Sequence, residues 1–264
     1  MLEAVFDRAR SGRRAAFIPY VMAGDPDAET TLAVLQALTE LGSDAIELGI
    51  PYGDPLADGP TVAAAGQRAL RAGMTIDGTL EIVRTHRENA GAPIVLFTYF
   101  NPIYQYGIVR FAKRAVDAGA SAVIVPDIAL EEGEELGATL ANAGLDMPLL
   151  VAPSTTHQRA ERIASQSTGF IYVVSRLGVT GADSKLRTGA LRGQIATLRG
   201  ITEKPLAVGF GVSVPEHVSA VASFADGIIV GSALIEAYAG SRGKEAAQRV
   251  RSFAAQLIPA AVFT

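Results

Sequence analysis

The amino-acid sequence predicts a single-domain (β/α)8 barrel, a TIM barrel, over residues 1–264, and three observations favour this fold class. The length is usual for one α/β barrel. With 49% hydrophobic and 19% charged residues, the chain can bury a large core and does not resemble a disordered one. Short apolar runs alternate with helical patterns from end to end. An open doubly wound sheet is the alternative, but the even spacing of the units favours the barrel.

Eight apolar runs are the expected strands. Their continuous apolar character is typical of parallel strands that are buried on both faces. In order they are "AAFIPYV" (15–21), "AIELGI" (45–50), "PIVLFTYF" (93–100), "AVIVPDI" (122–128), "PLLVAPS" (148–154), "FIYVVS" (170–175), "PLAVGFG" (205–211) and "GIIVGSA" (227–233). The helix-to-strand turn recurs as "LGSDAIEL", "AGASAVIV" and "FADGIIV", as expected of stacked βα units. Because no linker separates these units, we expect one domain.

The segments between the runs are amphipathic and carry signals for helix ends. Asp25-Pro26 is expected to cap the helix that begins at residue 27, and Gly42 follows the end of that helix. Ser213 and Glu216 have the spacing of a capping box at the start of a later helix. These signals place helices between successive strands.

Composition excludes several classes of function. The net charge is -4 and no run of Lys and Arg is present, so neither a nucleic-acid partner nor an anionic membrane is expected. Cysteine is absent, which excludes disulfides, thiol nucleophiles and cysteine zinc sites. No apolar run approaches the roughly 20 residues of a membrane span. The stretch "RSGRRAAFIPYVMAG" imitates a secretion signal, but its apolar part is short and contains Pro19, so a cytoplasmic location is expected.

Glu47 lies inside the second apolar run, where a charged residue is unexpected. Alternation along the strand places Ile46 and Leu48 on one face and Glu47 on the other. In a closed barrel the bulky face packs under helices and Glu47 points into the mouth. A buried carboxylate is costly unless it is paired or its pKa shifts, so Glu47 is a candidate catalytic acid. The alternative is an edge strand with Glu47 in water.

Two further acids, Asp54 and Asp58, follow on the loop "PYGDPLADGP" (51–60). The Asp54-Pro55 step is also typical of a turn, and Asp58 could cap the helix that follows it. Spacing alone therefore leaves both a structural and a functional role open. The three acids could hold a divalent metal, but no His or Asn ligand lies nearby in the sequence, and we expect no metal.

Glycine clusters follow the seventh and eighth expected strands, as "GFGVS" (209–213) and "GS" (231–232). Backbone N–H groups exposed by glycine before a helix start form an anion site, and in barrels a phosphate commonly binds after these two strands. A dinucleotide fingerprint is disfavoured, because Val214 stands where its third glycine is required. Glycines that serve tight turns only remain the alternative.

Other chemistry is disfavoured by what the chain lacks. It contains no G-x-S-x-G, P-loop or H-E-x-x-H motif, and its three histidines are expected at the surface: His86, His157 and His217. No lysine follows the end of an expected strand, which disfavours a Schiff-base aldolase; the lysines are Lys113, Lys185, Lys204 and Lys244. A phosphorylated substrate and carboxylate acid–base catalysis remain.

Motifs along nearly the whole chain resemble those of the tryptophan synthase α subunit family. The segment "ELGIPYGDPLADGP" is similar to the family's signature. The other matching segments, in the family's order, are "FIPYVMAGDP", "TYFNPIYQYG", "VIVPDI", "APSTT", "SRLGVTG", "VGFGVS" and "GIIVGSALI". The resemblance implies a (β/α)8 barrel that cleaves indole-3-glycerol phosphate to indole and glyceraldehyde 3-phosphate. It also implies that Glu47 and Asp58 are the two catalytic acids.

The resemblance further assigns binding residues and a partner. The phosphate site would comprise Gly181, Gly211, Gly231 and Ser232. The indole pocket would comprise Tyr20, Phe97, Tyr99, Ile124, Val151, Tyr172 and Phe210. Thr180 matches a lid threonine that meets the second acid, and Asp54 and Pro55 would touch the partner. That partner is a β subunit containing pyridoxal phosphate, in an αββα heterotetramer; no cofactor is implied in this chain.

The chain departs from the family at Gly53, where Ser or Thr is usual, and at Ala129 and Leu130, which replace a proline-containing turn. These departures lie outside the matched catalytic positions. Two rival functions stay open. Another phosphate-binding barrel isomerase would need a lysine or cysteine in the mouth, and a non-catalytic activator of a partner would be expected to lack one of the two acids.

Overall fold

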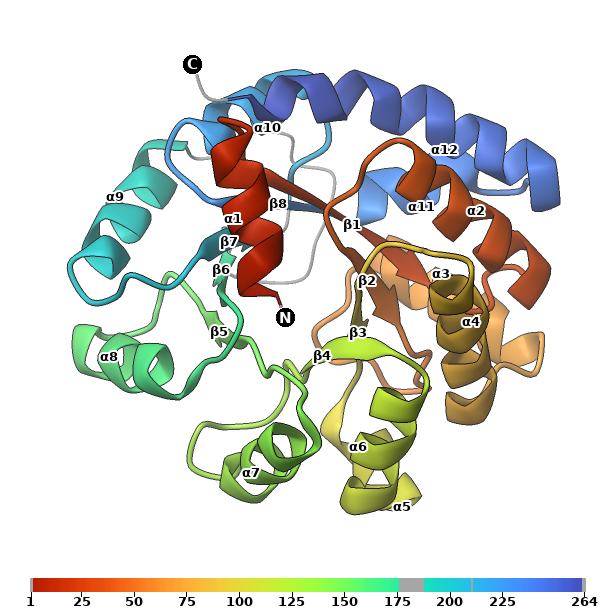
Figure 1. The fold of residues 1–264 in the computed structure, drawn as a ribbon, viewed down its shortest axis with the longest axis horizontal. Helices are drawn as coiled ribbons and strands as arrows, with labels where there is room; N and C mark the ends of the chain where they lie inside the picture. Colours follow the sequence, from red (N-terminus) through yellow and green to blue (C-terminus); the bar gives the residue numbers. More distant parts are fainter. Residues whose placement is uncertain (1, 176–187, 210, 263–264) are drawn as a thin grey trace.

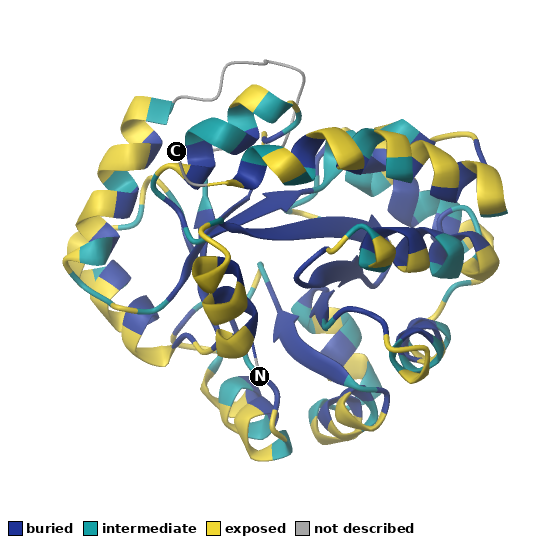
Figure 2. Cartoon of the chain, turned by 45° about the horizontal axis from the view of Figure 1, so that its top comes forward, coloured by how far each residue is buried: buried dark blue, intermediate teal, exposed yellow. Residues whose placement is uncertain are grey.

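The computed structural model describes residues 2–175, 188–209 and 211–262, and it confirms the predicted barrel. All eight expected strands are present: β1 (Ala16–Met22), β2 (Ile46–Gly49), β3 (Ile94–Phe97), β4 (Ala120–Ile124), β5 (Leu149–Val151), β6 (Ile171–Val174), β7 (Leu206–Gly209) and β8 (Gly227–Val230). They form one parallel sheet in the order β4-β3-β2-β1-β8-β7-β6-β5. The strands are almost entirely buried, as their continuous apolar runs predicted (Figure 2).

The ring closes between the two ends of this strand order. Asp146, which precedes β5, forms a parallel bridge with Ala122 of β4. The Val123 N–H donates to the Asp146 carbonyl at 2.9 Å, and the Asp146 N–H donates to the Ser121 carbonyl at 3.1 Å. The chain therefore joins β4 just before it enters β5, and the sheet curls into a barrel.

Helices surround this sheet (Figure 1). Helix α1 precedes β1, and one or more helices follow each strand along the chain. They are α1 (Glu3–Ser11), α2 (Ala28–Glu40), α3 (Pro60–Arg71), α4 (Ile76–Glu88), α5 (Phe100–Tyr106), α6 (Ile108–Asp117), α7 (Glu134–Ala143), α8 (His157–Gln166), α9 (Thr188–Arg199), α10 (Pro215–Ala222), α11 (Ser232–Tyr238), α12 (Gly243–Leu257) and the 3-10 helix η1 (Ile258–Ala261). Each outer helix buries one side against the strands and exposes the other (Figure 2). None of the helices in the described ranges is both long enough and apolar enough to cross a membrane.

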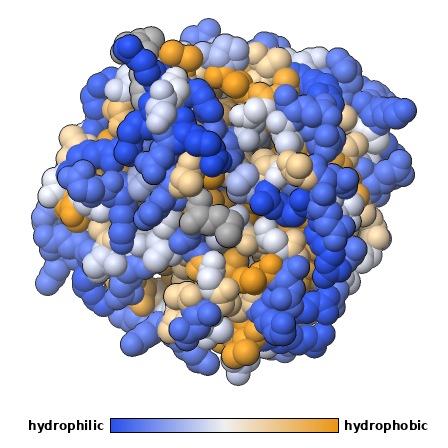
Figure 3. Space-filling view, in the orientation of Figure 1, coloured by the Kyte–Doolittle hydropathy of each residue, from blue (hydrophilic) through white to orange (hydrophobic). Residues whose placement is uncertain are grey.

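Helix α1 covers the N-terminal end of the barrel, in front of the strands in Figure 1. Its Phe6 packs against Phe170 with ring centroids 5.5 Å apart. Phe6 also lies over Gly227, where an added Cβ would come within 2.8 Å of the Phe6 ring. Hydrophilic side chains predominate on this face (Figure 3). With this end plugged, the opposite end, where the strands terminate, is left for a site.

The recurring helix-to-strand turn has a structural basis at this N-terminal end. The Asp44 carboxylate, just before β2, accepts the Phe17 N–H of β1 at 2.9 Å and binds Arg14. Asp226, just before β8, accepts the Leu206 N–H of β7 at 2.7 Å and pairs with Arg199. In both cases the turn aspartate bonds to the preceding strand, so two parts of the ring are clamped in the same way.

Two of the expected helix caps are wrong. Asp27, rather than Asp25, caps α2, because its carboxylate accepts the Thr30 N–H at 2.7 Å. Asp25 is buried instead and forms a two-bond ion pair with Arg68 of α3, at 2.7 and 2.8 Å. The cap of α10 is Val214, with no side-chain cap bond, so the expected capping box does not form there.

Candidate active site

Glu47 is buried inside the barrel wall. It sits on β2 between Tyr20 of β1 and Val95 of β3 in the strand register, and only 1% of its surface is exposed. Its Oε1 atom has no hydrogen-bond partner among the described residues. Burial in this position penalises the charged carboxylate and raises the pKa of Glu47 from 4.5 to about 8. The side chain is therefore mainly protonated at neutral pH and is available as an acid.

Asp58 lies on the loop that follows β2, two residues before α3 begins. It is half-buried, and desolvation raises its pKa from 3.8 to about 6, opposed by a hydrogen bond with the Tyr99 side chain. Asp58 is thus mainly ionised at neutral pH while Glu47 is mainly protonated. Two carboxyl groups whose environments separate their pKa values in this way can divide the roles of proton donor and charge stabiliser.

Both acids lie close enough to the same two tyrosines for their charges to act on them. Tyr20 on β1 and Tyr172 on β6 are buried, and burial is the main reason why the pKa of each hydroxyl is raised. The negative charges of Glu47 and Asp58 raise both of these pKa values further. The structure thus brings Glu47 and Asp58 together with two of the expected pocket residues.

A glycine lies under the hydroxyl of each tyrosine. An added Cβ at Gly49 would come within 2.1 Å of the Tyr20 oxygen, and one at Gly209 within 2.1 Å of the Tyr172 oxygen. These glycines end β2 and β7 and give the hydroxyl groups the space they occupy. The sequence indicated this role for neither glycine, because the need for glycine here arises from contacts between neighbouring strands; Gly209 was noted only as part of the cluster "GFGVS".

The other described pocket residues follow the rim at which the strands end. Phe97 is the last residue of β3 and meets the Tyr20 ring edge-on, with centroids 5.8 Å apart. Ile124 and Val151 are buried at the ends of β4 and β5. Phe210, Thr180 and Gly181 lie outside the described residues.

Tyr99 is placed differently from the other expected pocket residues. It lies two residues beyond the end of β3, where it precedes α5, and its hydroxyl accepts the Ala57 N–H at 3.0 Å. Burial raises the pKa of the Tyr99 hydroxyl, and the negative charge of Asp58, the next residue along the loop, raises it further. Tyr99 therefore contacts the loop that follows β2 through its hydroxyl group.

The glycine turns expected to bind phosphate lie at the same end of the barrel. Gly211 follows β7, is exposed and has a φ of 79°, a backbone conformation that favours glycine. Gly231 follows β8, and an added Cβ there would lie 3.5 Å from Tyr20. Ser232 begins α11 directly after it. The turn after β8 therefore lies beside Tyr20, one of the two tyrosines near the acids.

The residues expected to touch a partner lie on the outer part of the loop. Asp54 is exposed and Pro55 is half-buried. Leu56, which the sequence reasoning passed over, is 75% exposed and is the most exposed large hydrophobic side chain among the described residues. At Gly53 an added Cβ would meet no atom within 4 Å, so this departure leaves space open. Leu130, by contrast, packs against the core.

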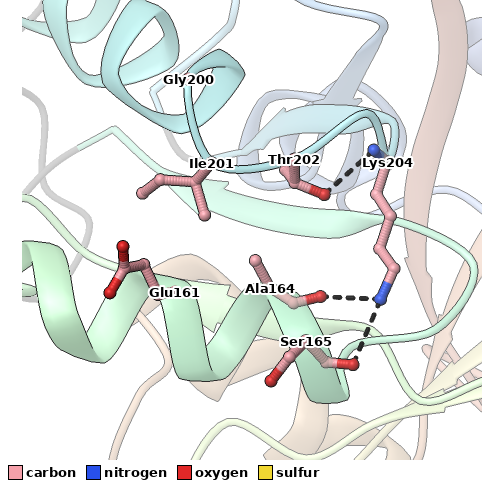
Figure 4. Close-up of a pocket in the computed structure, with 7 residues that line it drawn as sticks. All are labelled: Glu161, Ala164, Ser165, Gly200, Ile201, Thr202 and Lys204. Atoms are coloured by element: carbon pink, nitrogen blue, oxygen red, sulfur yellow. Dashed lines mark hydrogen bonds between the residues drawn. The ribbon is translucent and has the colours of Figure 1, made fainter.

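Lys204 and His86, a lysine and a histidine considered in the sequence analysis, have structural roles. Lys204 precedes β7, at the plugged end, and donates from Nζ to the carbonyls of Ala164 and Ser167 at 2.7 and 2.6 Å, which caps the end of α8 (Figure 4 shows the first of these bonds). The surface position expected for His86 is wrong. His86 is 3% exposed, with Nε2 3.2 Å from the Ala92 carbonyl. Among the described residues, no group of three or more acids, histidines or cysteines is arranged to hold a metal.

Comparisons with known proteins identify the family of the chain. The family model "Tryptophan synthase alpha chain" matches residues 6–261. The tryptophan synthase alpha chain of Gloeobacter violaceus is 45% identical over 96% of this chain and 92% of the relative. That of Thermosynechococcus vestitus is 46% identical over 88% and 87%, respectively.

Solved structures give the same result. A chain of Mycobacterium tuberculosis tryptophan synthase superposes with a TM-score of 0.91 at 36% identity and covers 100% of this chain and 98% of its own. The tryptophan synthase alpha chain of Legionella pneumophila gives a TM-score of 0.87 at 32% identity, with 98% and 96% covered. These matches, over nearly the whole chain, show that it belongs to the tryptophan synthase alpha chain family, whose members are lyases of tryptophan biosynthesis.

Proposed function

We propose that the chain cleaves indole-3-glycerol phosphate by a retro-aldol step, with Glu47 and Asp58 as its catalytic residues. One observation carries the proposal. Two carboxyl groups that lie near the same buried tyrosines have pKa values of about 8 and about 6, so that one is protonated and the other ionised at neutral pH.

The indole ring can separate from the glycerol phosphate chain only after C3 of the ring is protonated, because protonation turns the ring into an electron sink. Glu47 donates this proton, and the positive charge that develops at N1–H is stabilised by the Asp58 carboxylate. The Glu47 carboxylate then takes the proton of the hydroxyl on the side chain. The carbon–carbon bond breaks, its electron pair returns to the ring, and indole and glyceraldehyde 3-phosphate are released. Glu47 ends in its original protonation state.

The expected pocket residues account for binding of the substrate. Tyr20, Phe97 and Tyr172 offer flat, buried surfaces to the indole ring. Ile124 and Val151 complete the apolar lining, together with Phe210 as the sequence resemblance implies. Backbone N–H groups at Gly211, Gly231 and Ser232, with Gly181, would hold the phosphate. The substrate supplies its own electron sink, so the proposal requires neither a metal nor a cofactor in this chain.

The partner is a β subunit that contains pyridoxal phosphate, in an αββα assembly. Indole is neutral and apolar, so a second enzyme docked at the barrel mouth would capture it before it escapes. Asp54 and Pro55 would lie in the contact, and the exposed Leu56 beside them supports an apolar docking point. The sequence resemblance implies that Thr180, which lies outside the described residues, meets Asp58 when the site closes. The partner would favour the closed state without supplying a catalytic group to this chain.

The direct test is release of indole from indole-3-glycerol phosphate by the purified chain, with and without β subunit. We expect weak activity alone and a marked increase with the β subunit. Absence of indole release under both conditions would exclude the proposed reaction. Full activity of the isolated chain would exclude the activating role of the partner.

A further inference from the structure

We propose that Asp25 is a positioning residue for catalysis: its ion pair with Arg68 fixes helix α3, and with it the preceding residue Asp58, against the end of β1. This inference rests on the proposed function. The observation that carries it is a two-bond ion pair with a buried carboxylate. Arg68 Nε donates to Asp25 Oδ1 at 2.7 Å, and Arg68 Nη2 donates to Asp25 Oδ2 at 2.8 Å.

The carboxylate of this pair belongs to the end of β1. Asp25 lies three residues beyond that strand, and its backbone N–H donates to the Met22 carbonyl at 3.3 Å. The same strand carries Tyr20, one of the expected pocket residues. Only 1% of Asp25 is exposed, so its charge would be costly without a partner. Arg68 supplies that partner, and the pair therefore connects the strand of Tyr20 to α3.

The packing of α3 against the barrel gives the helix little resistance to sliding. Its buried residues are small: Ala65, Gly66 and Ala69. An added Cβ at Gly66 would lie 3.5 Å from Met22 Cε, so the helix runs close to the end of β1. Side chains that interlock with a neighbouring element fix the position of a helix along its axis, and alanine and glycine interlock little. The two bonds of Arg68 supply a register that these residues do not.

A shift of α3 would be passed directly to Asp58. Gly59 is the N-cap of the helix, its carbonyl accepts the Ala63 N–H at 2.9 Å, and Asp58 is the residue before it. Pro60, whose ring fixes φ, is the first helical residue. Asp58 is thus joined to α3 through a single residue. Because a misplacement of about 1 Å can cost about 10²-fold in rate, the register of α3 matters for a carboxylate that must meet the indole N1–H.

Helix α11 encloses the ion pair and adds a weaker link to α3. The two helices are in contact and lie on the same side of the barrel (Figure 1). Tyr238 of α11 is buried; burial raises the pKa of its hydroxyl, and the negative charge of Asp25 raises it further. The Thr61 hydroxyl of α3 donates to the Glu236 carboxylate of α11 at 2.7 Å, but this bond is exposed and water can replace it. Asp25, with almost no access to water, keeps its partner.

The test compares Asp25→Asn with Asp44→Asn. Asp44 is a matched control, because it is also buried and also forms two bonds to an arginine, Arg14, but at the plugged end of the barrel. The double variant Asp25→Asn with Arg68→Met removes both charges of the pair, so that neither is left without a partner. The full chain is used for all variants.

Three quantities are measured. The kcat and KM of indole release are determined with the β subunit present, at a temperature at which circular dichroism shows every variant to be folded. The free energy of unfolding is obtained from chemical denaturation. Amide hydrogen exchange along α3 reports the hold on this helix without reference to activity.

For Asp25→Asn we expect kcat to fall about 10- to 100-fold while KM changes far less, since the phosphate turns are on other elements. Exchange along α3 accelerates. Asp44→Asn loses stability but keeps kcat near that of wild type, with no selective change in α3. The double variant is more stable than a chain with one unpaired charge, yet its kcat stays low because the two bonds that set the register are absent.

A near-normal kcat in Asp25→Asn, or an equal fall in Asp44→Asn, would overturn the positioning role. So would unchanged exchange along α3 in Asp25→Asn, or recovery of kcat together with stability in the double variant. Failure of the proposed function gives a different pattern: wild type releases no indole, while exchange along α3 still responds to Asp25→Asn and not to Asp44→Asn. In that case Asp25 fixes α3 as inferred, and the catalytic use of this arrangement is overturned.

Discussion

Replacing Glu47 by Gln should abolish turnover and at the same time stabilise the folded protein at neutral pH. The amide has the shape and the neutral charge of a protonated carboxyl group, but it cannot transfer a proton. Loss of a general acid–base group typically costs about 10²–10⁴-fold in rate. Because the Glu47 side chain is buried, with no partner for Oε1, its ionisation also lowers the free energy of unfolding.

The size of this loss in the free energy of unfolding follows from the pKa values of Glu47 in the unfolded and folded chain. In the unfolded chain Glu47 has its ordinary pKa of 4.5, and in the folded chain about 8. Below pH 4.5 the carboxyl group is protonated in both states. Between these two values the unfolded chain releases a proton that the folded chain retains, so the free energy of unfolding falls by about 1.4 kcal/mol per pH unit. By pH 7 the accumulated loss is about 3 kcal/mol, and above pH 8 it grows no further.

The measurement is chemical denaturation of wild type and Glu47→Gln at several values between pH 4.5 and pH 8, with indole release measured in parallel. The free energy of unfolding of the variant, relative to wild type, should rise by about 3 kcal/mol from pH 4.5 to pH 7. Glu135→Gln, at an exposed position on α7, serves as the control, and its difference from wild type should stay nearly constant.

Two results would refute this reasoning. If the stability difference between wild type and Glu47→Gln does not change with pH, Glu47 does not titrate in the way its burial requires. If the folded variant releases indole at a near-normal rate, Glu47 is not the proton donor. A variant that is more stable and inactive would support both the assignment and the expected conflict between stability and activity at a catalytic site.

Three further changes probe the rest of the site. Asp58→Asn should lower kcat by about 10²–10³-fold through lost charge stabilisation, and should remove the acidic limb near pH 6 from the rate profile; a loss confined to KM would mean that Asp58 serves binding. Gly211→Asp should raise KM sharply, since it adds a negative charge to the expected phosphate turn, and unchanged affinity for glyceraldehyde 3-phosphate would move the phosphate site elsewhere. Gly209→Ala should displace Tyr172 and cost about 1–3 kcal/mol in the free energy of unfolding, with a raised KM; normal stability and KM would show that the hydroxyl has room to move.

The features that sequence reasoning recovered are those with a local signal. A buried parallel strand is a continuous apolar run, so each of the eight runs could be recognised by itself. Glu47 stood out because a charge interrupts such a run on the face away from Ile46 and Leu48. Its depth in the barrel, and hence its raised pKa, follows from strand pairing that no short segment contains.

The features that sequence reasoning missed depend on distant residues. Asp25 looked like a helix cap, but its partner is Arg68, 43 residues further along the chain. The resemblance assigned Tyr99 to the indole pocket, and it gave no sign that the Tyr99 hydroxyl contacts Ala57, 42 residues earlier. His86 was expected at the surface, yet a carbonyl acceptor at Ala92 satisfies it in the interior. In each case the missing information was a tertiary contact.

The pairing of each buried tyrosine with a glycine has a stereochemical consequence. Tyr20 is in register with Glu47, and Gly49 lies two residues beyond; Tyr172 is in register with Ala207, and Gly209 lies two residues beyond. The barrel therefore presents the same arrangement twice, and a methyl group in the second replaces the carboxyl group of the first. A flat ring held between the tyrosines would meet an acid on its β2 side and an inert surface on its β7 side. Proton delivery would then be restricted to one face of the ring.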